Sequence, residues 1–154
     1  MKRTVLFLLT FFSLHIVLLA QGNKRQVGFN VIGKYIAMQG YDPVGYFDQN
    51  KAIVGKATHA VVHDGITYYF SSPQNKAAFL IQPQKYEPQY GGWCAYAMGA
   101  TGEKVSVDPA TFKIINGKLF LFYNRFFNNT LKSWNKSEKS LNIKADANWS
   151  KIFN

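Results

Sequence analysis

The segment 61–90 constrains the fold of this chain most strongly, because in it two runs of β-branched and aromatic residues flank an Asp64-Gly65 pair. A two-residue type I′ loop needs positive φ at both central positions, and Asp-Gly adopts that conformation at low cost. Ser72 then offers a side-chain oxygen that can cap a helix, and Pro83 ends that helix. The segment therefore predicts a β-hairpin packed on one helix.

The position of the loop also predicts which residues face one another across the two strands. Counted outward from the loop, the opposing pairs are His63–Ile66, Val61–Tyr68 and His59–Phe70. Both faces of the ribbon carry apolar side chains, so we expect it to be covered on both sides rather than to lie on the surface.

A second hairpin is expected at 112–123, where an Asn116-Gly117 pair separates two apolar runs. Three further candidate helices are 93–98, 125–135 and Ser140–Phe153. Upstream, the Asp-Pro turn signal within 40–47 predicts an extended loop tucked against the core. The recurrence of a hairpin followed by a helix indicates either a weak internal duplication or a pattern that hairpins generally favour. The expected fold class is α+β, with two β-hairpins packed with three or four short helices.

The first twenty residues differ from the rest of the chain. A basic start precedes an apolar run from Val5 to Leu19, and small residues follow at Ala20 and Gly22. This order is typical of a secretory signal peptide. We therefore expect a cleaved signal peptide over 1–20, a single domain over 21–154, a periplasmic or secreted location, and no membrane span after cleavage. An uncleaved anchor is the alternative, which the short run disfavours.

The chain is strongly basic, with a formal charge of +10 at pH 7, of which Lys2 and Arg3 contribute two and the exported part +8. A basic exported domain can meet anionic lipid, polysaccharide or cell wall, but a soluble surface with surplus lysine is the simpler interpretation. The cations within 104–151 are scattered, so nucleic acid is not expected as a partner.

Cys94 is the single cysteine of the chain, so no internal disulfide can form. Met98 follows it by four residues on the expected helix 93–98, which places the two side chains on one face. A thiolate and a thioether form a soft pair suited to Cu(I), so copper is the metal that this pair favours. The alternatives are that both are core residues or that Cys94 is a reactive thiol.

His59 and His63 are the two histidines outside the expected signal peptide. On a strand they stand about 13 Å apart, at ~3.3 Å per residue, so they cannot jointly bind one ion. One of them can still complete a metal site with Cys94 and Met98; otherwise each lies at a sheet margin with a polar partner. The chain has no paired-carboxylate, Gly-x-Ser-x-Gly or His-Glu-x-x-His motif, so we do not expect an enzyme.

Four aromatic residues gather in the loop region 86–96, namely Tyr86, Tyr90, Trp93 and Tyr96. They can line a pocket for a small molecule or a glycan. The simpler interpretation is that they belong to the hydrophobic core.

Four short motifs follow one another over about residues 40–90: Asp42-Pro43-Val44, Tyr68-Tyr69-Phe70-x-Ser72, Phe79 and Pro83-x-x-Tyr86. This arrangement resembles the YHS domain, a relative of the TRASH metal-binding modules. The longer pattern through Tyr90-Gly91-Gly92-Trp93-Cys94-Ala95-Tyr96-Ala97 and Lys144-Ala145-Asp146-Ala147-Asn148-Trp149 resembles exported bacterial proteins that carry a YHS-like core with extensions. The resemblance implies a small ββα module associated with heavy-metal handling, copper in particular.

The chain departs from this family at the metal ligands. Metal-binding relatives have cysteine at the positions that Gly45, Ser71 and Asn75 occupy here, so the family's metal site cannot be carried over. A bound metal would instead use Cys94 and its neighbours. The leading hypothesis is an exported, non-enzymatic binding protein of the cell envelope for a soft metal such as copper. The alternative is a small-ligand or protein interaction module that uses the aromatic loop 86–96 without metal.

Overall fold

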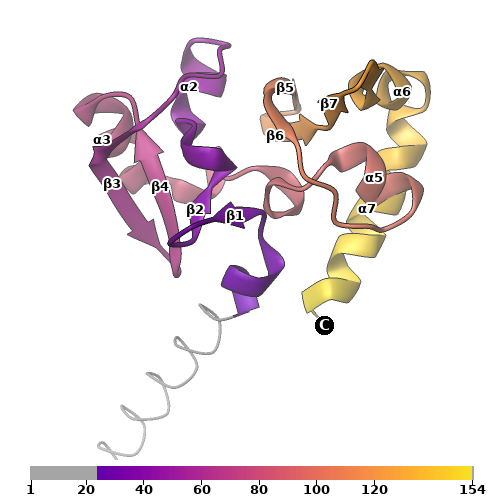
Figure 1. Ribbon diagram of the computed structural model, residues 1–154, viewed down its shortest axis with the longest axis horizontal. Coiled ribbons are helices and arrows are strands. Elements are labelled where there is room, and N and C mark those ends of the chain that lie inside the picture. Colours follow the sequence, from indigo (N-terminus) through magenta and orange to yellow (C-terminus); the bar gives the residue numbers. More distant parts are fainter. Residues whose placement is uncertain (1–23, 154) are drawn as a thin grey trace, which may run out of the picture.

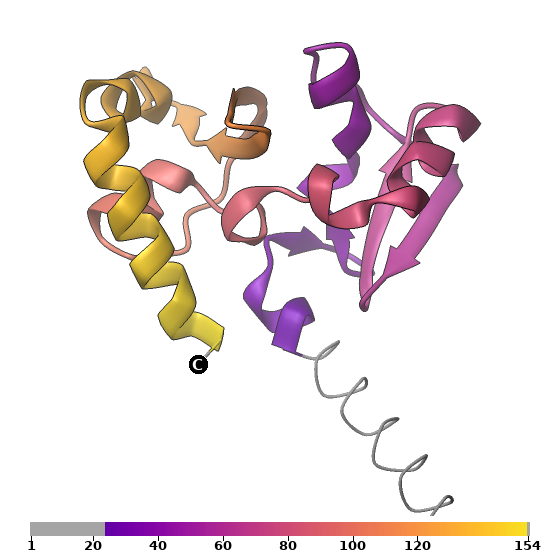
Figure 2. The ribbon, with the colours of Figure 1, turned by 180° about the vertical axis from the view of Figure 1, so that it is seen from behind.

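The computed structural model describes residues 24–153, so the predicted signal peptide over 1–20 lies outside the described residues. The fold mixes helices with short strands, and the predicted α+β class is confirmed. Two views of the ribbon show an N-terminal and a C-terminal group of elements, connected by the chain around residues 83–92 (Figures 1 and 2). No helix among the described residues is long and apolar enough to cross a membrane.

The N-terminal group is built on a sheet with the strand order β1 (Val31–Ile32), β2 (Ile36–Ala37), β4 (Ile66–Phe70) and β3 (Lys56–His63). Strands β3 and β4 form the hairpin predicted from Asp64-Gly65, whose φ angles are +47° and +79°. Positive φ at both positions is the signature of the type I′ loop, so the turn chemistry in the sequence determines the turn.

The register of this hairpin agrees with the prediction near the loop and departs from it farther away. The pairs Val61–Tyr68 and His63–Ile66 are confirmed. The pair His59–Phe70 is wrong, because the register shifts along β3 and Phe70 faces Lys56 instead. An irregularity of this kind inserts residues into one strand only, and no local turn signal announces it.

Helix α3 (Pro73–Ile81) covers one face of this sheet, as Figure 2 shows. Phe79 of this helix is fully buried, and its ring centroid lies 4.8 Å from that of Tyr68 and 5.1 Å from that of Phe70. On β3, Val62 is 69% exposed, so the expectation that both faces of the hairpin are covered is wrong there.

Two helices of the N-terminal group begin at capping side chains. Ser72 accepts a hydrogen bond from the Asn75 N–H at 3.1 Å, which confirms the predicted start of α3. Asp42 accepts one from the Val44 N–H at 2.9 Å and caps α2 (Pro43–Asp48). The extended loop expected over 40–47 is therefore wrong, because the Asp-Pro pair starts a helix rather than a turn. The 3-10 helix η1 (Met38–Gly40) precedes this cap.

The C-terminal group contains the second predicted hairpin, formed by β5 (Asp108–Ile115) and β6 (Lys118–Phe122). Asn116 and Gly117 in its loop have φ angles of +50° and +72°, so this turn is confirmed as well. Around it lie α5 (Ala95–Ala100), α6 (Thr130–Lys136) and α7 (Glu138–Phe153), as Figure 1 shows.

A further small hairpin separates β6 from α6. It consists of β7 (Asn124–Arg125) and β8 (Asn128–Asn129), which pair antiparallel. The helix predicted over 125–135 therefore begins only at Thr130, where Asn129 accepts a hydrogen bond from the Leu131 N–H at 3.0 Å. The predicted last helix is present and begins slightly earlier than Ser140, at Glu138.

Strand β6 lies between two hydrophobic cores. Successive side chains of a strand point to opposite faces. Leu119 and Leu121 belong to the core of the N-terminal group, whereas Phe120 and Phe122 belong to the core between α5, α6 and α7. Pro88 forms a bridge with Leu119, so the segment connecting the two groups is held against β6.

Candidate ligand-binding site

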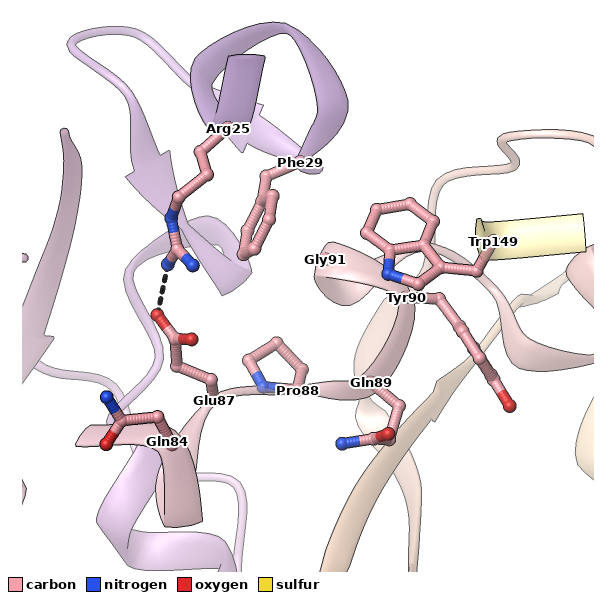
Figure 3. Close-up of a pocket in the computed structure, with 9 residues that line it drawn as sticks. All are labelled: Arg25, Phe29, Gln84, Glu87, Pro88, Gln89, Tyr90, Gly91 and Trp149. Carbon is pink, nitrogen blue, oxygen red and sulfur yellow. Dashed lines mark hydrogen bonds and ion pairs between the residues drawn. The ribbon is translucent and has the colours of Figure 1, made fainter. Parts of the chain in front are cut away.

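The chain between the two groups of elements forms one wall of a pocket. It consists of α4 (Pro83–Tyr86), an extended step at Glu87 and Pro88, and the 3-10 helix η2 (Gln89–Gly92). A cavity of about 350 Å³ lies beside it, at the lower end of the size range of small-molecule sites (Figure 3). We name it the connector pocket; its lining residues are Arg25, Phe29, Gln84, Glu87, Pro88, Gln89, Tyr90, Gly91 and Trp149.

A tight backbone turn at Tyr90 and Gly91 shapes the pocket, with φ angles of +55° and +58°. A Cβ at Gly91 would lie 2.9 Å from side-chain atoms of both Phe29 and Trp149. Glycine alone combines this left-handed conformation with so close an approach at little cost. The Asn30 N–H donates to the Gly91 carbonyl at 2.8 Å, which holds the turn against the N-terminal segment.

An ion pair between Arg25 and Glu87 forms the polar end of the pocket. The Tyr68 hydroxyl donates to the same Glu87 oxygen at 2.7 Å. Burial lowers the pKa of Arg25, but the hydrogen bond and the charge of Glu87 outweigh it and raise that pKa, so the guanidinium stays charged. Arg25 Nε is buried without a hydrogen-bond partner among the described residues. A buried donor of this kind needs an acceptor, and a ligand or an ordered water in the pocket can supply one.

Aromatic rings form one side of the pocket, beginning with Phe29, whose ring centroid lies 4.4 Å from the Arg25 guanidinium carbon. The Trp149 ring centroid lies 6.1 Å from that of Phe29 and 6.3 Å from that of Tyr90, both in edge-on geometry. The Tyr90 hydroxyl donates to Asp146 at 2.9 Å and lies 3.0 Å from Asn142 Oδ1, which fixes α7 against η2. Burial, helped by the Asp146 charge, raises the pKa of Tyr90, so its hydroxyl remains a donor.

Figure 3 shows how these groups surround the cavity. Phe29 and Trp149 lie along one side, with Pro88 and Gln89 across from them and the Arg25–Glu87 pair at one end. The arrangement places flat apolar surface opposite hydrogen-bonding groups, so it can hold a small ligand that has one apolar face and a polar edge.

The four aromatic residues predicted for a ligand site do not gather in one place. Tyr90 lines the connector pocket, whereas Tyr86 is buried in the core of the N-terminal group. Trp93 donates its indole N–H to the Gly28 carbonyl at 2.6 Å and so holds the helical residues 24–28. Tyr96 lines a second, more apolar cavity of about 330 Å³ beside α5.

Most residues of the connector pocket could not be identified from sequence. Arg25 and Phe29 lie in a segment that carries no motif, and Gln84 and Glu87 carry no signal beyond their polarity. Trp149 contacts Phe29 and Tyr90 and so docks the last helix against the pocket. The pocket depends on three segments that only the fold brings together.

The predicted metal residues Cys94 and Met98 belong to different cores. Cys94 is fully buried; the Tyr123 N–H donates to its sulfur at 3.3 Å, and Thr130 Oγ1 lies 3.4 Å away. Cys94 is the N-cap residue of α5 and not a helical position, so the expected helical alignment with Met98 does not apply. The sulfur thus has hydroxyl and amide neighbours rather than metal ligands.

His59 and His63 lie on β3, far from these sulfurs. Both views place β3 and α5 at opposite sides of the molecule (Figures 1 and 2). His63 lies 3.5 Å from Asp64 and packs its ring against Phe79. Within residues 24–153 no group of three or more His, Cys, Asp and Glu side chains could hold a metal ion. The structure therefore does not bring the four predicted metal residues together.

The positions where the metal-binding relatives carry cysteine form a hydrogen-bonded cluster here. Oδ2 of the buried Asp42 accepts bonds from the Ser71 N–H at 2.8 Å, the Ser71 hydroxyl at 2.6 Å and the Asn75 amide at 2.7 Å. Asn75 also donates to the Ser71 hydroxyl at 3.2 Å. The third position is Gly45, in α2. The Asp42 carboxylate already accepts four hydrogen bonds, and none of these three positions supplies a thiolate. The cluster therefore does not suit a soft metal.

No family model, curated protein or solved structure matches this chain. The resemblance to the YHS domain, and what it implies, therefore stay predictions from the sequence.

Proposed function

We propose that this chain is a non-enzymatic binding protein of the cell envelope that takes a small, sugar-like ligand in the connector pocket. The observation that supports this most directly is the convergence of Trp149 and Phe29 with the Arg25–Glu87 pair around one cavity of about 350 Å³. The location in the cell envelope rests on the predicted signal peptide over 1–20.

The expected ligand chemistry follows from the aromatic side of the pocket and from its polar groups. A sugar ring has an apolar C–H face, which packs on aromatic rings such as Trp149, and an edge of hydroxyls, which both donate and accept. Gln84 is exposed at the rim and offers an amide that can do both. Arg25 adds a donor and Glu87 an acceptor. A purely apolar ligand would leave these polar groups desolvated and unpaired.

Soft-metal binding is the less favoured alternative. Cu(I) would need thiolate, thioether or imidazole ligands converging on one point. Cys94 is surrounded by the Tyr123 amide and the Thr130 hydroxyl, and Met98 lies in the other core. The fold would have to open at α5 before such a site could form.

The proposal is tested by titrating the protein with N-acetylglucosamine and its β-linked disaccharide while recording the heat of binding by calorimetry. Trp149→Ala should abolish the saturable heat signal. Gln84→Ala should weaken binding by roughly fivefold to tenfold, because one hydrogen bond is worth ~1 kcal/mol. Gln74→Ala is the matched control, since Gln74 is also exposed, lies on α3 and does not line the pocket.

Two outcomes would refute this function. The first is the absence of any saturable heat signal with either sugar. The second is binding by Trp149→Ala as tight as that of the unchanged protein, with circular dichroism showing that the variant is folded.

A further inference from the structure

The hairpin of β7 and β8 carries two phenylalanines at its tip that contact little else. Phe126 is 88% exposed and Phe127 is 111% exposed, more than in an extended reference peptide. They occupy the two central positions of the turn between Arg125 and Asn128. Two adjacent aromatic rings therefore project from the surface, which is unusual because isolated exposure of single apolar residues is the norm.

The backbone of this turn is also costly for phenylalanine. Phe126 and Phe127 have φ angles of +51° and +63°, a left-handed region that bulky side chains rarely adopt. The two other described hairpins that have two-residue loops use Asp64-Gly65 and Asn116-Gly117 at the same two positions. Tyr35 and Tyr90 also have positive φ, but among the described two-residue hairpin loops only this one has bulky side chains at both positions. Strain and exposed apolar surface at one position together point to a function of the side chains themselves.

The surroundings of the tip are positively charged. Between residues 118 and 137 there is no Asp or Glu, and the four cations are all exposed: Lys118, Arg125, Lys132 and Lys136. Figures 1 and 2 show β7 and α6 side by side at one end of the molecule. The closest acidic residue along the chain, Glu138, is engaged in an ion pair with Lys113. Asp108 lies at the base of this hairpin, where its Oδ2 accepts a bond from the Asn124 amide at 3.5 Å. The four cations outnumber this carboxylate, so the tip presents apolar rings within a mainly basic region.

We propose that the Phe126–Phe127 tip inserts into the interface of a membrane that contains anionic lipid. Aromatic side chains enter the boundary between headgroups and acyl chains, and nearby Lys and Arg are attracted to anionic headgroups. A protein partner fits less well, since two rings on a convex turn bury far less area than a stable protein interface needs. The inference is independent of the connector pocket.

The test uses vesicles of phosphatidylcholine with and without phosphatidylglycerol, in a co-sedimentation assay at low and high salt. The protein is used as recovered from the producing cells, with the same N-terminus in every variant. The unchanged protein should bind the anionic vesicles, and binding should weaken at high salt. The decisive variant is Phe126→Asn with Phe127→Gly, which restores the turn chemistry of the other hairpins.

This double variant should fold at least as stably, because its turn no longer holds large side chains at positive φ. Its binding to anionic vesicles should fall by roughly tenfold for each ring removed. Ile81→Ser is the matched control, since Ile81 is 86% exposed on α3, and it should bind as the unchanged protein does. Arg125→Gln should weaken binding severalfold and reduce its salt dependence.

Three results would overturn the proposal: no binding of the unchanged protein to anionic vesicles, equal binding by the double variant, or an equal loss of binding in Ile81→Ser. If the unchanged protein instead self-associated without binding vesicles, and the double variant stayed monomeric, the tip would be a contact between copies of the chain.

Discussion

The carboxylate of Asp42 organises the start of two helices, and its removal provides the sharpest test of the fold. The side chain is fully buried. Its Oδ1 accepts the Val44 N–H at 2.9 Å and caps α2. Its Oδ2 accepts three further bonds at 2.6–2.8 Å, two from Ser71 and one from Asn75. The site links a helix start to the end of β4 and the first turn of α3.

The magnitude for Asp42→Ala follows from these four bonds. A hydrogen bond to a charged group contributes about 1.5–3 kcal/mol, and a buried donor left unpaired costs about 1–3 kcal/mol. Relief of the buried charge offsets part of this loss. We therefore expect a loss of about 4 kcal/mol in the free energy of unfolding, or roughly 8–16 °C in the melting temperature at this chain length.

Urea unfolding followed by far-ultraviolet circular dichroism measures this loss. Asp48→Ala is the matched control, because Asp48 is exposed on the same helix, and we expect a change within about 0.5 kcal/mol. A loss below about 1 kcal/mol for Asp42→Ala would refute the argument, since the four bonds would then be unimportant for stability.

Three further predictions concern other parts of the molecule. Gly91→Ala should lower the free energy of unfolding, measured in urea, by about 2–4 kcal/mol, because the new Cβ would lie 2.9 Å from two aromatic side chains. Gly117→Ala is the control: its Cβ would have no neighbour within 4 Å, so the loss should be only about 1–2 kcal/mol. Burial raises the pKa of Tyr46 and Tyr68, so both stay neutral in the folded protein as pH rises above 10. Their contribution to stability is complete below pH 10 and is lost progressively above it, which spectrophotometric titration with parallel unfolding curves would detect. The buried Cys94 thiol should react with a thiol reagent far faster in urea than in buffer, and equal rates would contradict its burial.

Local turn and capping chemistry accounts for the parts of the fold that could be predicted. Asp64-Gly65 and Asn116-Gly117 specify hairpins because the two residues themselves supply the positive φ values. Ser72 specifies a helix start because its hydroxyl reaches an N–H three residues away. Such signals act within a few residues and can be seen in the sequence.

The parts that could not be predicted depend on residues far apart in the chain. Asp42 looked like a turn residue, and only its bonds to Ser71 and Asn75 show why the carboxylate is buried at a helix start. The shifted register of β3 has no local marker. The tip at Phe126 carries no turn signal, since phenylalanine is unfavourable at positive φ.

The candidate site was the least accessible from sequence. Of the four aromatic residues predicted from the loop 86–96, only Tyr90 lines the connector pocket, because the sequence pattern does not distinguish a core ring from a pocket ring. Arg25 and Trp149 lie at opposite ends of the described chain and meet only through packing on the connecting segment. The helical alignment expected for Cys94 and Met98 does not form, because Cys94 precedes α5 instead of lying within it.

The claim that the connector pocket binds a small sugar-like ligand is tested most directly by the indole N–H signals of the three tryptophans in a ¹H–¹⁵N spectrum. On titration with the disaccharide of N-acetylglucosamine, the Trp149 signal should shift and saturate. The signal of Trp134, which is fully buried and bonded to Glu138, should stay in place. An unmoved Trp149 signal, or parallel unsaturated drift of all three signals, would contradict the account.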